Sequence, residues 1–420
     1  MNRQDEDILR RLAADLAEIA QLSVHREKAE LWRRLNDLEP VRPMVWITET
    51  PWHEMEDGSG ELTLHCTDPW ARGQEWQLRV LLYEWRHLRV DRIISDYLPC
   101  PKAIHNTGYG LDVDMDCVTT DPSSDIISRR FHPRIREPED IEKIRMPEVW
   151  HDEAATEANY ARMCDVYEGI MPVRLEGVRH IWFTPWDHLV QWWGVEQVMM
   201  DLLLRPEMVH AAVERCVASS LAGLDQLEAQ GLLSYGCDNM RVGSGAYGYT
   251  KALPAPGHDP DRVRARDMWG CSNAQILSTV SPEMHWEFAV KHDLPWFERW
   301  GLNYYGCCEP LDTKIDVLRR IPRLRKVSIS PWADVSRAAE GIGRDYVISY
   351  KPNPAVVADA AWRPEMVRQQ LRDAIRRMAA CPLEIVLKDI STVRHEPRRL
   401  WDWARIVMEV VDEVSCEARA

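Results

Sequence analysis

The sequence has little of what marks several common protein classes. It contains only 4 phenylalanines among 420 residues, its formal net charge is -15, and no segment approaches the roughly 18 consecutive apolar residues of a membrane span. An acidic balance gives no electrostatic footprint for a nucleic-acid backbone or an anionic membrane. The opening residues, MNRQDEDILRRLAADL, place acids and arginines where a signal peptide needs an apolar core. We therefore expect a soluble, cytoplasmic protein.

The sequence also lacks the cysteine spacing of a disulfide-bonded protein and the glycine-rich motifs of a nucleotide-binding protein. The 11 cysteines are scattered, mostly singly, which predicts reduced thiols instead of a disulfide framework. No glycine-rich nucleotide fingerprint follows a strand-like run, and the glycine-rich stretch 242–257 lacks the Gly-Lys-Ser/Thr ending of a phosphate loop. We predict a flexible loop there. The one unusual cysteine motif is NYYGCCEPLD (303–312), in which Cys307 and Cys308 are adjacent.

What the chain does have is an alternation of strand-like and helical segments. Eight short apolar runs end in polar, Gly- or Pro-containing turns, and helical stretches such as 194–230, 281–301 and 363–381 lie between them. The strand-like runs are 43–49, 91–97, 171–177, 231–239, 301–309, 324–332, 345–354 and 383–391. This alternation predicts an α/β fold with a parallel sheet, and eight such strands close into a (β/α)8 TIM barrel. A doubly wound open sheet is the alternative.

Two segments interrupt this rhythm. Residues 3–36 have helical spacing and many charges, so we predict an N-terminal helical extension over 1–40, followed by the barrel over 41–420. The irregular stretch at about 98–165 is rich in Asp, Pro and Arg. Insertions of that size are typically functional, and we expect this one to cap one mouth of the barrel.

Polar side chains follow the predicted strands. The active site of a TIM barrel lies at the C-terminal ends of its strands, and the side chains found there include Glu49, Cys237, Asp238, Cys307, Cys308, Glu309, Lys388 and Asp389. Salt bridges or helix caps remain the alternative for some of them. Tryptophan is plentiful, with 19 copies, and Trp52 and Trp332 stand at strand-to-loop junctions. They could wall a pocket for a flat or apolar ligand, although core packing is the commoner role of tryptophan.

Three stretches resemble the uroporphyrinogen decarboxylase superfamily, which includes corrinoid-dependent methyltransferases. They are EGVRHIWFTPWDHLVQWWGVEQVMMDLLLRPEMVHAAVE (176–214), SPEMHWEFAVKHDLPWFERWG (281–301) and YYGCCEPLD (304–312). The resemblance runs over roughly 165–415 and implies a (β/α)8 barrel. The chain is most similar to the methyltransferase branch.

Two departures from the family pattern narrow the function. The decarboxylase proper begins its barrel with an Arg-bearing segment, whereas this chain has the acidic ITETPWHEM (47–55), which would repel a substrate with many carboxylates. The thiol methyltransferases of the family hold zinc with His-x-Cys and a distant cysteine. Here the tripeptide is Tyr305-Gly306-Cys307, and the last strand ends in Lys388-Asp389.

The sequence therefore does not decide whether this site binds a metal. Cys307, Cys308 and Cys237 could hold zinc with an open position for substrate. A metal-free site in which Glu309, Lys388 and Asp389 act as acid, base or orienting groups is the alternative, and inert buried cysteines are a third.

The resemblance and these departures favour a methyltransferase component that demethylates a small O- or N-methylated compound and passes the methyl group to a corrinoid (cobalamin) carried by a partner protein. The leaving atom needs electrophilic help, from zinc or a positioned acid. We predict catalytic roles for Glu49, Glu309, Lys388 and Asp389, and substrate contacts for Trp52, Asp238, Tyr305 and Trp332. The alternatives are a decarboxylase-like lyase acting on a small carboxylic acid or porphyrinogen, and a non-catalytic barrel.

Overall fold

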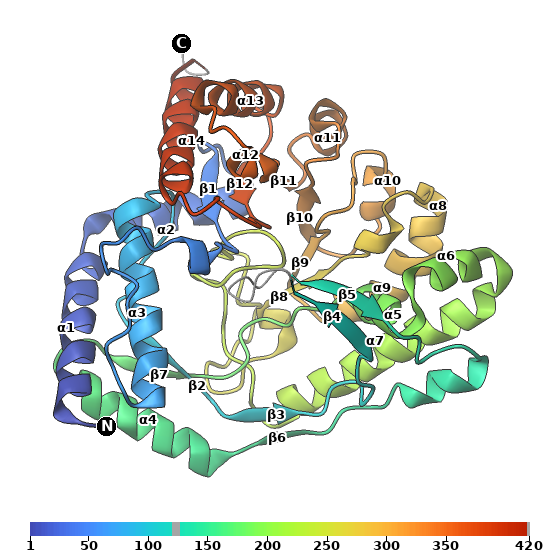
Figure 1. The fold of residues 1–420 in the computed structure, drawn as a ribbon. Coiled ribbons are helices and arrows are strands. Elements are labelled where there is room, and N and C mark those ends of the chain that lie inside the picture. Colours follow the sequence, from blue (N-terminus) through green and yellow to red (C-terminus); the bar gives the residue numbers. More distant parts are fainter. Residues whose placement is uncertain (120–126, 418–420) are drawn as a thin grey trace.

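A mostly parallel sheet of six strands forms the centre of the molecule (Figure 1). The computed structural model describes residues 1–119 and 127–417. The strand order is β1-β12-β11-β10-β9-β8. Their bounds are β1 Met44–Ile47, β8 Trp269–Ser272, β9 Leu302–Tyr305, β10 Leu324–Ile329, β11 Val347–Tyr350 and β12 Leu383–Leu387. All five pairings are parallel, so their C-terminal ends meet at one edge.

Helices connect these strands and cover the outer face of the sheet (Figure 1). The sheet is buried on both faces, as parallel sheets generally are: β1, β8, β9 and β12 are buried throughout. The helices of this half are α8 Pro282–His285, the π-helix η5 Trp286–Val290, α9 Lys291–Phe297, α10 Ile315–Leu318, α11 Val335–Ile342, α12 Ala355–Ala358, α13 Pro364–Arg377 and α14 Arg398–Glu417.

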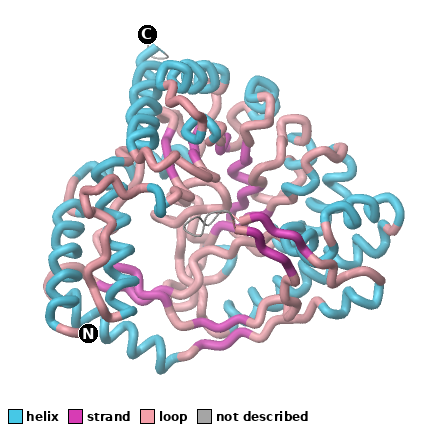
Figure 2. The backbone as a smooth tube through the Cα atoms, in the orientation of Figure 1, coloured by secondary structure: helices cyan, strands magenta, loops and turns pink. Residues whose placement is uncertain are grey.

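The remaining strands form three two-stranded sheets. β2 (Leu98–Pro101) pairs in parallel with β7 (Val173–Glu176), and one parallel bridge, Val178 to Leu233, extends this pair. The antiparallel pairs are β3 (Ile104–Asn106) with β6 (Val149–His151) and β4 (Met115–Val118) with β5 (Ser128–Phe131). Within the described residues no ladder joins β1 to β2 or β8 to the Leu233 segment, so a closed barrel is not shown. Figure 2 shows how short the strands are beside the loops that connect them.

Six of the eight predicted strand segments contain a strand of the structure. The prediction was wrong for 91–97, which is irregular and precedes β2, and for 231–239, which contributes only the bridge at Leu233. β8 was missed because its sequence, WGCS, has no β-branched residue and includes a glycine.

Helices before β1 confirm the helical spacing of the N-terminal residues. They are α1 Arg3–Ala20 and α2 Ser23–Asn36, followed after β1 by the short 3-10 helix η1 Trp52–Glu54 and by α3 Pro69–His87. Asn2 caps the N-terminus of α1, because its side chain accepts a hydrogen bond from the Asp5 N–H. Leu9 and Leu12 of α1 share a hydrophobic cluster with Leu78 of α3. α2 instead places Trp32 in a cluster with the first residues of β1 and β11, so it covers the N-terminal end of the sheet.

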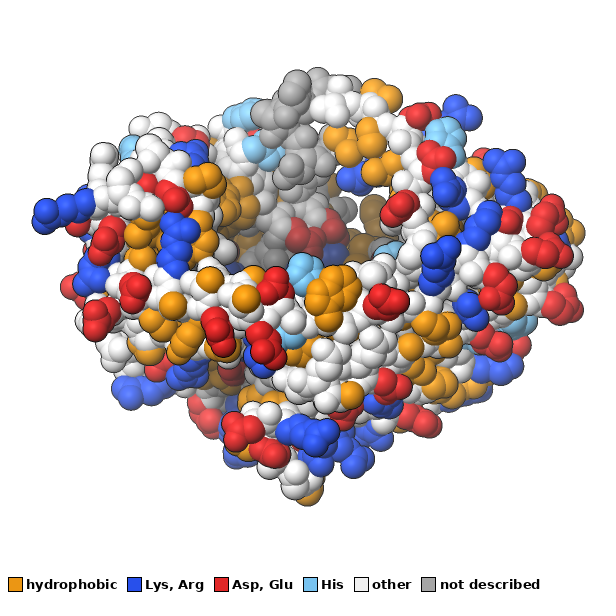
Figure 3. Space-filling model, turned by 90° about the horizontal axis from the view of Figure 1, so that it is seen from below, with side chains coloured by type: hydrophobic (Ala, Val, Ile, Leu, Met, Phe, Trp, Pro, Cys, Tyr) orange, Lys and Arg blue, Asp and Glu red, His pale blue; other side chains and the backbone are white. Residues whose placement is uncertain are grey.

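The predicted insertion at about 98–165 contains strands β2 to β6, the 3-10 helix η2 (Pro138–Lys143) and part of α4 (Glu153–Tyr167). Its residues 120–126 lie outside the described residues, and its capping of a mouth stays a prediction. Helices α5 Pro185–Trp193, α6 Val195–Leu204 and α7 Pro206–Ala229 follow β7, and the 3-10 helices η3 Ala265–Asp267 and η4 Gln275–Leu277 flank β8. Figure 3 shows a hollow in the face seen from below, with charged side chains inside it.

Residues 242–257 contain no helix or strand, and residues 242–248 of this predicted loop are buried. They pack against the face of the central sheet that carries Tyr304 and Glu384. A Cβ atom at Gly243 would lie 2.5 Å from the Tyr304 ring, and one at Gly245 would lie 2.5 Å from the Glu384 carboxylate. Glycine is required at both positions because the backbone approaches these side chains too closely for any other residue.

Two further findings concern cysteines and membranes. All eleven cysteines are free thiols, as their scattered positions predicted. Among residues 1–119 and 127–417, no helix combines the length and the apolar character that crossing a bilayer requires.

Candidate functional site

Four segments bring charged and sulfur-bearing side chains together at the C-terminal edge of the central sheet. Because β1, β9 and β12 are parallel, the residues that follow them lie near one another. We call the resulting group the mouth cluster; its members are Glu49 after β1, Arg241 from the segment before the buried glycines, Cys307 and Cys308 after β9, and Lys388 and Asp389 after β12.

Lys388 is the centre of the mouth cluster. Its Nζ lies 2.8 Å from Oδ2 of Asp389, 3.4 Å from Sγ of Cys307 and 3.9 Å from both Sγ of Cys308 and Oε2 of Glu49. The residue is only 5% exposed. Burial alone would lower the pKa of Lys388, but the negative charges of Cys307 and Glu49 outweigh it and raise the pKa. The side chain is therefore held as an ammonium ion.

Cys307 is the more acidic of the two thiols. The hydrogen bond from Cys308, whose Sγ lies 3.5 Å away, lowers the pKa of Cys307; burial opposes this, and the Lys388 ammonium adds to it. The pKa of Cys308 is raised, first by its bond to Cys307 and then by burial. Oδ2 of Asp389, 3.7 Å from Sγ of Cys308, is the alternative acceptor for the single Cys308 proton. Cys307, next to the ammonium, is therefore the thiol of this pair that ionises first.

Glu309 is fully buried behind the two cysteines. Its Oε2 accepts from the Cys307 N–H at 2.8 Å, and its Oε1 accepts from the Ala274 N–H at 3.0 Å. Burial raises its pKa, while these backbone donors oppose the shift. Both oxygens are occupied by backbone, so the geometry is that of a clamp between the loops after β8 and β9. The predicted catalytic role of Glu309 stays a prediction.

Glu49 and Asp389 form the exposed rim of the mouth cluster, with side chains 38% and 53% exposed. The Asp389 N–H donates to Oε2 of Glu49 at 3.0 Å, and Arg241 donates to Oε1 at 2.8 Å. Partial burial would raise the pKa of Glu49, but Lys388 and Arg241 hold it at about 2. Both residues have positive φ angles, 54° for Glu49 and 55° for Asp389. Such backbone strain in non-glycine residues concentrates at functional sites.

A second group of polar side chains lies inside the sheet, below the mouth cluster. We call it the interior network: Tyr304, Lys326, Ser349, Lys351 and Glu384, all 3% exposed or less. Lys351 Nζ donates to the Tyr304 hydroxyl at 2.6 Å and to Oγ of Ser349 at 2.7 Å. Glu384 accepts from Ser349 at 2.6 Å and pairs with Lys326 at 2.8 Å. Burial lowers the pKa of Lys351 to about 7.

Sequence reasoning missed Arg241 and His180. Arg241 connects to Glu49, and His180 accepts from the Gly243 N–H through Nε2 at 3.1 Å. Desolvation, helped by the charge of Arg241, lowers the pKa of His180 to about 4, so the ring is neutral. Both residues lie on irregular segments, where strand-end reasoning does not apply. The glycine-rich sequence just after Arg241 was the available signal, because it marks a close backbone approach.

Other predicted residues make their contacts elsewhere. The Tyr305 hydroxyl, fully buried, lies 2.7 Å from Nε2 of His285. Cys237 donates to the backbone carbonyl of Asp267. Trp52 packs edge-on against Trp76 and Tyr83. Trp332 is 72% exposed, so it stands free for a contact. Their substrate and metal roles stay predictions.

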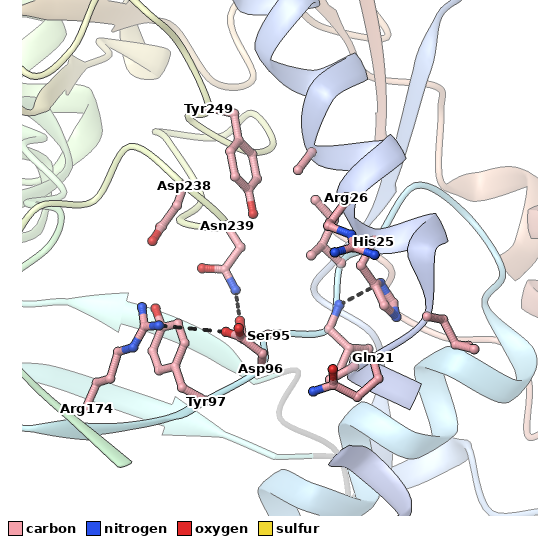
Figure 4. A pocket seen from close by; sticks show the side chains of 15 residues that line it. Gln21, His25, Arg26, Ser95, Asp96, Tyr97, Arg174, Asp238, Asn239 and Tyr249 are labelled. Atoms are coloured by element: carbon pink, nitrogen blue, oxygen red, sulfur yellow. Dashed lines mark hydrogen bonds and ion pairs between the residues drawn. The ribbon is translucent and has the colours of Figure 1, made fainter. Parts of the chain in front are cut away.

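Asp238 lies in a separate pocket of about 330 Å³ beside the N-terminal helices (Figure 4). It pairs with Arg179, and its neighbour Asn239 donates to Ser95. The polar residues around this pocket are Gln21, His25, Arg26, Ser95, Asp96, Tyr97, Arg174, Asp238, Asn239 and Tyr249. Asp238 thus does not join the mouth cluster, although Arg241 is only three residues away in the chain.

The zinc predicted at Cys307, Cys308 and Cys237 stays a prediction. Among residues 1–119 and 127–417, no three His, Cys, Asp or Glu side chains are grouped so that they could hold a metal ion. Cys307 and Cys308 are together, but Lys388 occupies the position next to both sulfurs. Structural and catalytic zinc sites use at least three protein ligands. Within the described residues, Lys388 is the cation that lies beside both sulfurs.

The fold is similar to that of a known enzyme. No family model and no curated protein matches the sequence. Among solved structures, a methyltransferase from Methanosarcina mazei aligns with a TM-score of 0.52 at 10% sequence identity, over 92% of this chain and 99% of that chain. At this identity the likeness shows the fold alone.

Proposed function

We propose that the protein is a methyltransferase that removes a methyl group from a small O- or N-methylated compound at the mouth cluster and passes it to a corrinoid carried by a partner protein. The observation that carries this proposal is the buried Lys388 ammonium, which lies beside Cys307 at the edge where the parallel strands end. The likeness in fold to a methyltransferase and the sequence resemblance support it.

The same edge supports the inference of a barrel-type arrangement. In the central sheet, strands β8 to β12 lie side by side in the order in which they occur in the chain, and β1 lies next to β12. The parallel pair β2 and β7, with its bridge to Leu233, supplies further strands of the same kind. We infer a (β/α)8-type barrel in which the hydrogen bonding between strands is interrupted between β1 and β2 and between β8 and the Leu233 segment.

Lys388 provides the electrophilic help that methyl transfer from oxygen or nitrogen needs. As the C–O bond of a methyl ether or the C–N bond of a neutral amine breaks, negative charge develops on the leaving atom, and a nearby ammonium stabilises it and can donate a proton. A quaternary nitrogen leaves as a neutral amine and draws no such help from Lys388. Asp389, at 2.8 Å, and Glu49, at 3.9 Å, hold Lys388 in place. The corrinoid, when bound with its partner, supplies the methyl acceptor. The half-exposed rim leaves the mouth accessible to such a partner.

Methyl transfer can be measured directly. The purified protein is incubated with methoxylated aromatics, methylamines or betaines and with reduced corrinoid, and the absorbance of methylcobalt is followed. We expect formation with at least one class of donor, and a loss of at least about tenfold in Lys388→Met, since one positioned charge contributes on this order or more. The matched control is Lys251→Met, which changes an exposed lysine outside the mouth cluster. Elemental analysis of the same sample tests the predicted zinc.

The alternative lyase gives a different result. If carbon dioxide is released from a small carboxylic acid and methylcobalt forms with no donor, the protein is a decarboxylase and the methyltransferase proposal fails. Neither product with any compound would favour a non-catalytic barrel.

A further inference from the structure

We propose that Cys307 and Cys308 are a site of reversible oxidative modification, at which a hydroperoxide converts the two thiols to a disulfide between neighbouring residues. The modification is a property of the chain's own thiols and needs no methyl donor. Its effect on activity rests on the proposed function, since the disulfide would remove the sulfur anion beside Lys388.

The backbone turns both thiols to the same side. On a regular strand, adjacent side chains point to opposite faces, but the Sγ atoms of Cys307 and Cys308 are 3.5 Å apart. The turn begins at Gly306, whose φ is 98°, and a Cβ there would lie 2.5 Å from Leu311. Only glycine fits this position. The strand thus ends just before the two cysteines, whose sulfur atoms lie on the same side of the chain.

The surroundings suit a reaction with peroxide. The Lys388 ammonium lies 3.4 Å from Sγ of Cys307 and favours its anion, and Oδ2 of Asp389 lies 3.7 Å from Sγ of Cys308 as an acceptor for its proton. Cys308 is partly exposed, so solutes reach the pair. By contrast, Cys271 and Cys237 are buried and donate to backbone carbonyls. Reactive cysteines are accessible and have a cationic neighbour.

The chemistry balances with one peroxide per pair. The sulfur of Cys307 attacks the terminal oxygen of the hydroperoxide; the O–O bond breaks, and the alcohol or water leaves with a proton. The sulfur of Cys308 then attacks the resulting sulfenic acid, the S–O bond breaks, and hydroxide leaves as water with the Cys308 proton. The thiols lose two electrons and two protons, and the peroxide is reduced by two electrons.

The product should be easy to reduce. Neighbouring residues joined by a trans peptide have Cα atoms about 3.8 Å apart, whereas disulfides usually span about 4.4–6.8 Å. Strained disulfides are reduced more readily than relaxed ones. We therefore expect a dithiol to restore both thiols, which makes the modification a switch and not damage.

Mass analysis of the full-length protein tests the proposal. After brief treatment with hydrogen peroxide, free thiols are alkylated and the protein is cleaved after Lys and Arg. The peptide 300–314, WGLNYYGCCEPLDTK, contains only these two cysteines, so its disulfide form is unambiguous. We expect this peptide two hydrogens lighter and unalkylated, with both thiols recovered after dithiol treatment.

Variants make the result decisive. In Cys308→Ser, Cys307 should stop at sulfenic acid or oxidise further, and Lys388→Met should slow the disulfide by on the order of tenfold. Cys117→Ser, which removes an exposed thiol on β4, should change nothing. The proposal is overturned if the 300–314 peptide keeps two alkylated thiols while other cysteines oxidise, or if its cysteines bond to another peptide. Either result leaves the methyl-transfer assay unaffected.

Discussion

Two lysine-centred groups occupy the same sheet and differ in what surrounds them. In the interior network, Lys326 and Glu384 are fully buried and every partner is another buried group of the protein. In the mouth cluster, Lys388 is equally buried, but its carboxylate partners Glu49 and Asp389 are 38% and 53% exposed. A closed network fixes structure, whereas a buried charge with an exposed rim can meet an incoming molecule.

The lysine pKa values separate the two groups in the same way. Burial lowers the pKa of Lys351 to about 7 despite the nearby Glu384. At Lys388 burial acts in the same direction, but the charges of Cys307 and Glu49 reverse it and the pKa is raised. Near neutral pH, Lys351 exchanges between its charged and neutral forms, whereas Lys388 stays charged. The first group is a closed, buried network, and the chemical role of the second is the one proposed above.

The largest expected effect comes from breaking the interior network. Lys326→Met removes the cation that pairs directly with the fully buried Glu384, and removal of one partner of a buried pair typically costs about 3–5 kcal/mol. Chemical denaturation at pH 7 measures the free energy of unfolding. Lys251→Met is the matched surface control. A loss below about 1 kcal/mol would contradict a closed, structural network.

The buried glycine segment that packs on this network should be nearly as sensitive. In Gly245→Ala the new Cβ would lie 2.5 Å from Glu384 and 2.7 Å from the Tyr304 ring, and overpacking of this kind costs about 1–3 kcal/mol. The control is Gly73→Ala, because Gly73 lies in α3 with open space around it. There we expect a gain of about 0.5–1 kcal/mol. Equal effects at both positions would contradict the packed segment.

The pKa of the buried acid Asp293 is shifted in the opposite direction to that of Glu384. Asp293 is buried and receives a hydrogen bond from Ser272, and burial raises its pKa to about 8 from 3.8. The folded state therefore binds the proton more tightly, so this contribution to stability is complete below about pH 4 and is lost as pH rises toward about 8. The slope is at most about 1.4 kcal/mol per pH unit.

Asp293→Asn should remove this slope. Unfolding measured from pH 4 to pH 8 should show the variant gaining stability relative to the wild type as pH rises. Parallel curves for the two proteins would show that Asp293 ionises normally and that burial does not control it.

The smallest effect on stability is expected at the mouth cluster. Lys388→Met should cost only about 1 kcal/mol, because Asp389 is solvated, Glu49 keeps Arg241 and Cys307 can take up a proton. The same variant should slow alkylation of Cys307 by iodoacetamide on the order of tenfold, since the thiolate loses its cation. A loss of stability as large as that of Lys326→Met would show that the mouth cluster stabilises the fold as much as the interior network does.

The sequence predicted most of the sheet and part of the site. Runs rich in β-branched residues, such as LRKVSI at β10, became strands, and the rule that strand ends converge brought Glu49, Cys307, Lys388 and Asp389 together. The rule failed where the chain is irregular. Arg241 joins the mouth from a non-strand segment, and residues 231–239 form no ladder, so Cys237 lies elsewhere.

The clamp at Glu309 could not be foreseen for a related reason. Its two oxygens are taken by the backbone N–H groups of Cys307 and Ala274. Ala274 follows β8, the strand that residue type did not reveal. A carboxylate next to two cysteines reads as a reactive group in the sequence, and only the tertiary contact between two loops shows what it holds.

The most direct test of the central claim is methyl transfer by Lys388→Met beside the wild type and Lys251→Met, with reduced corrinoid and each class of methylated donor. We expect methylcobalt formation by the wild type and the control, and a rate reduced at least about tenfold in Lys388→Met with the protein still folded. Equal rates in all three proteins would show that the mouth cluster is not where the chemistry occurs.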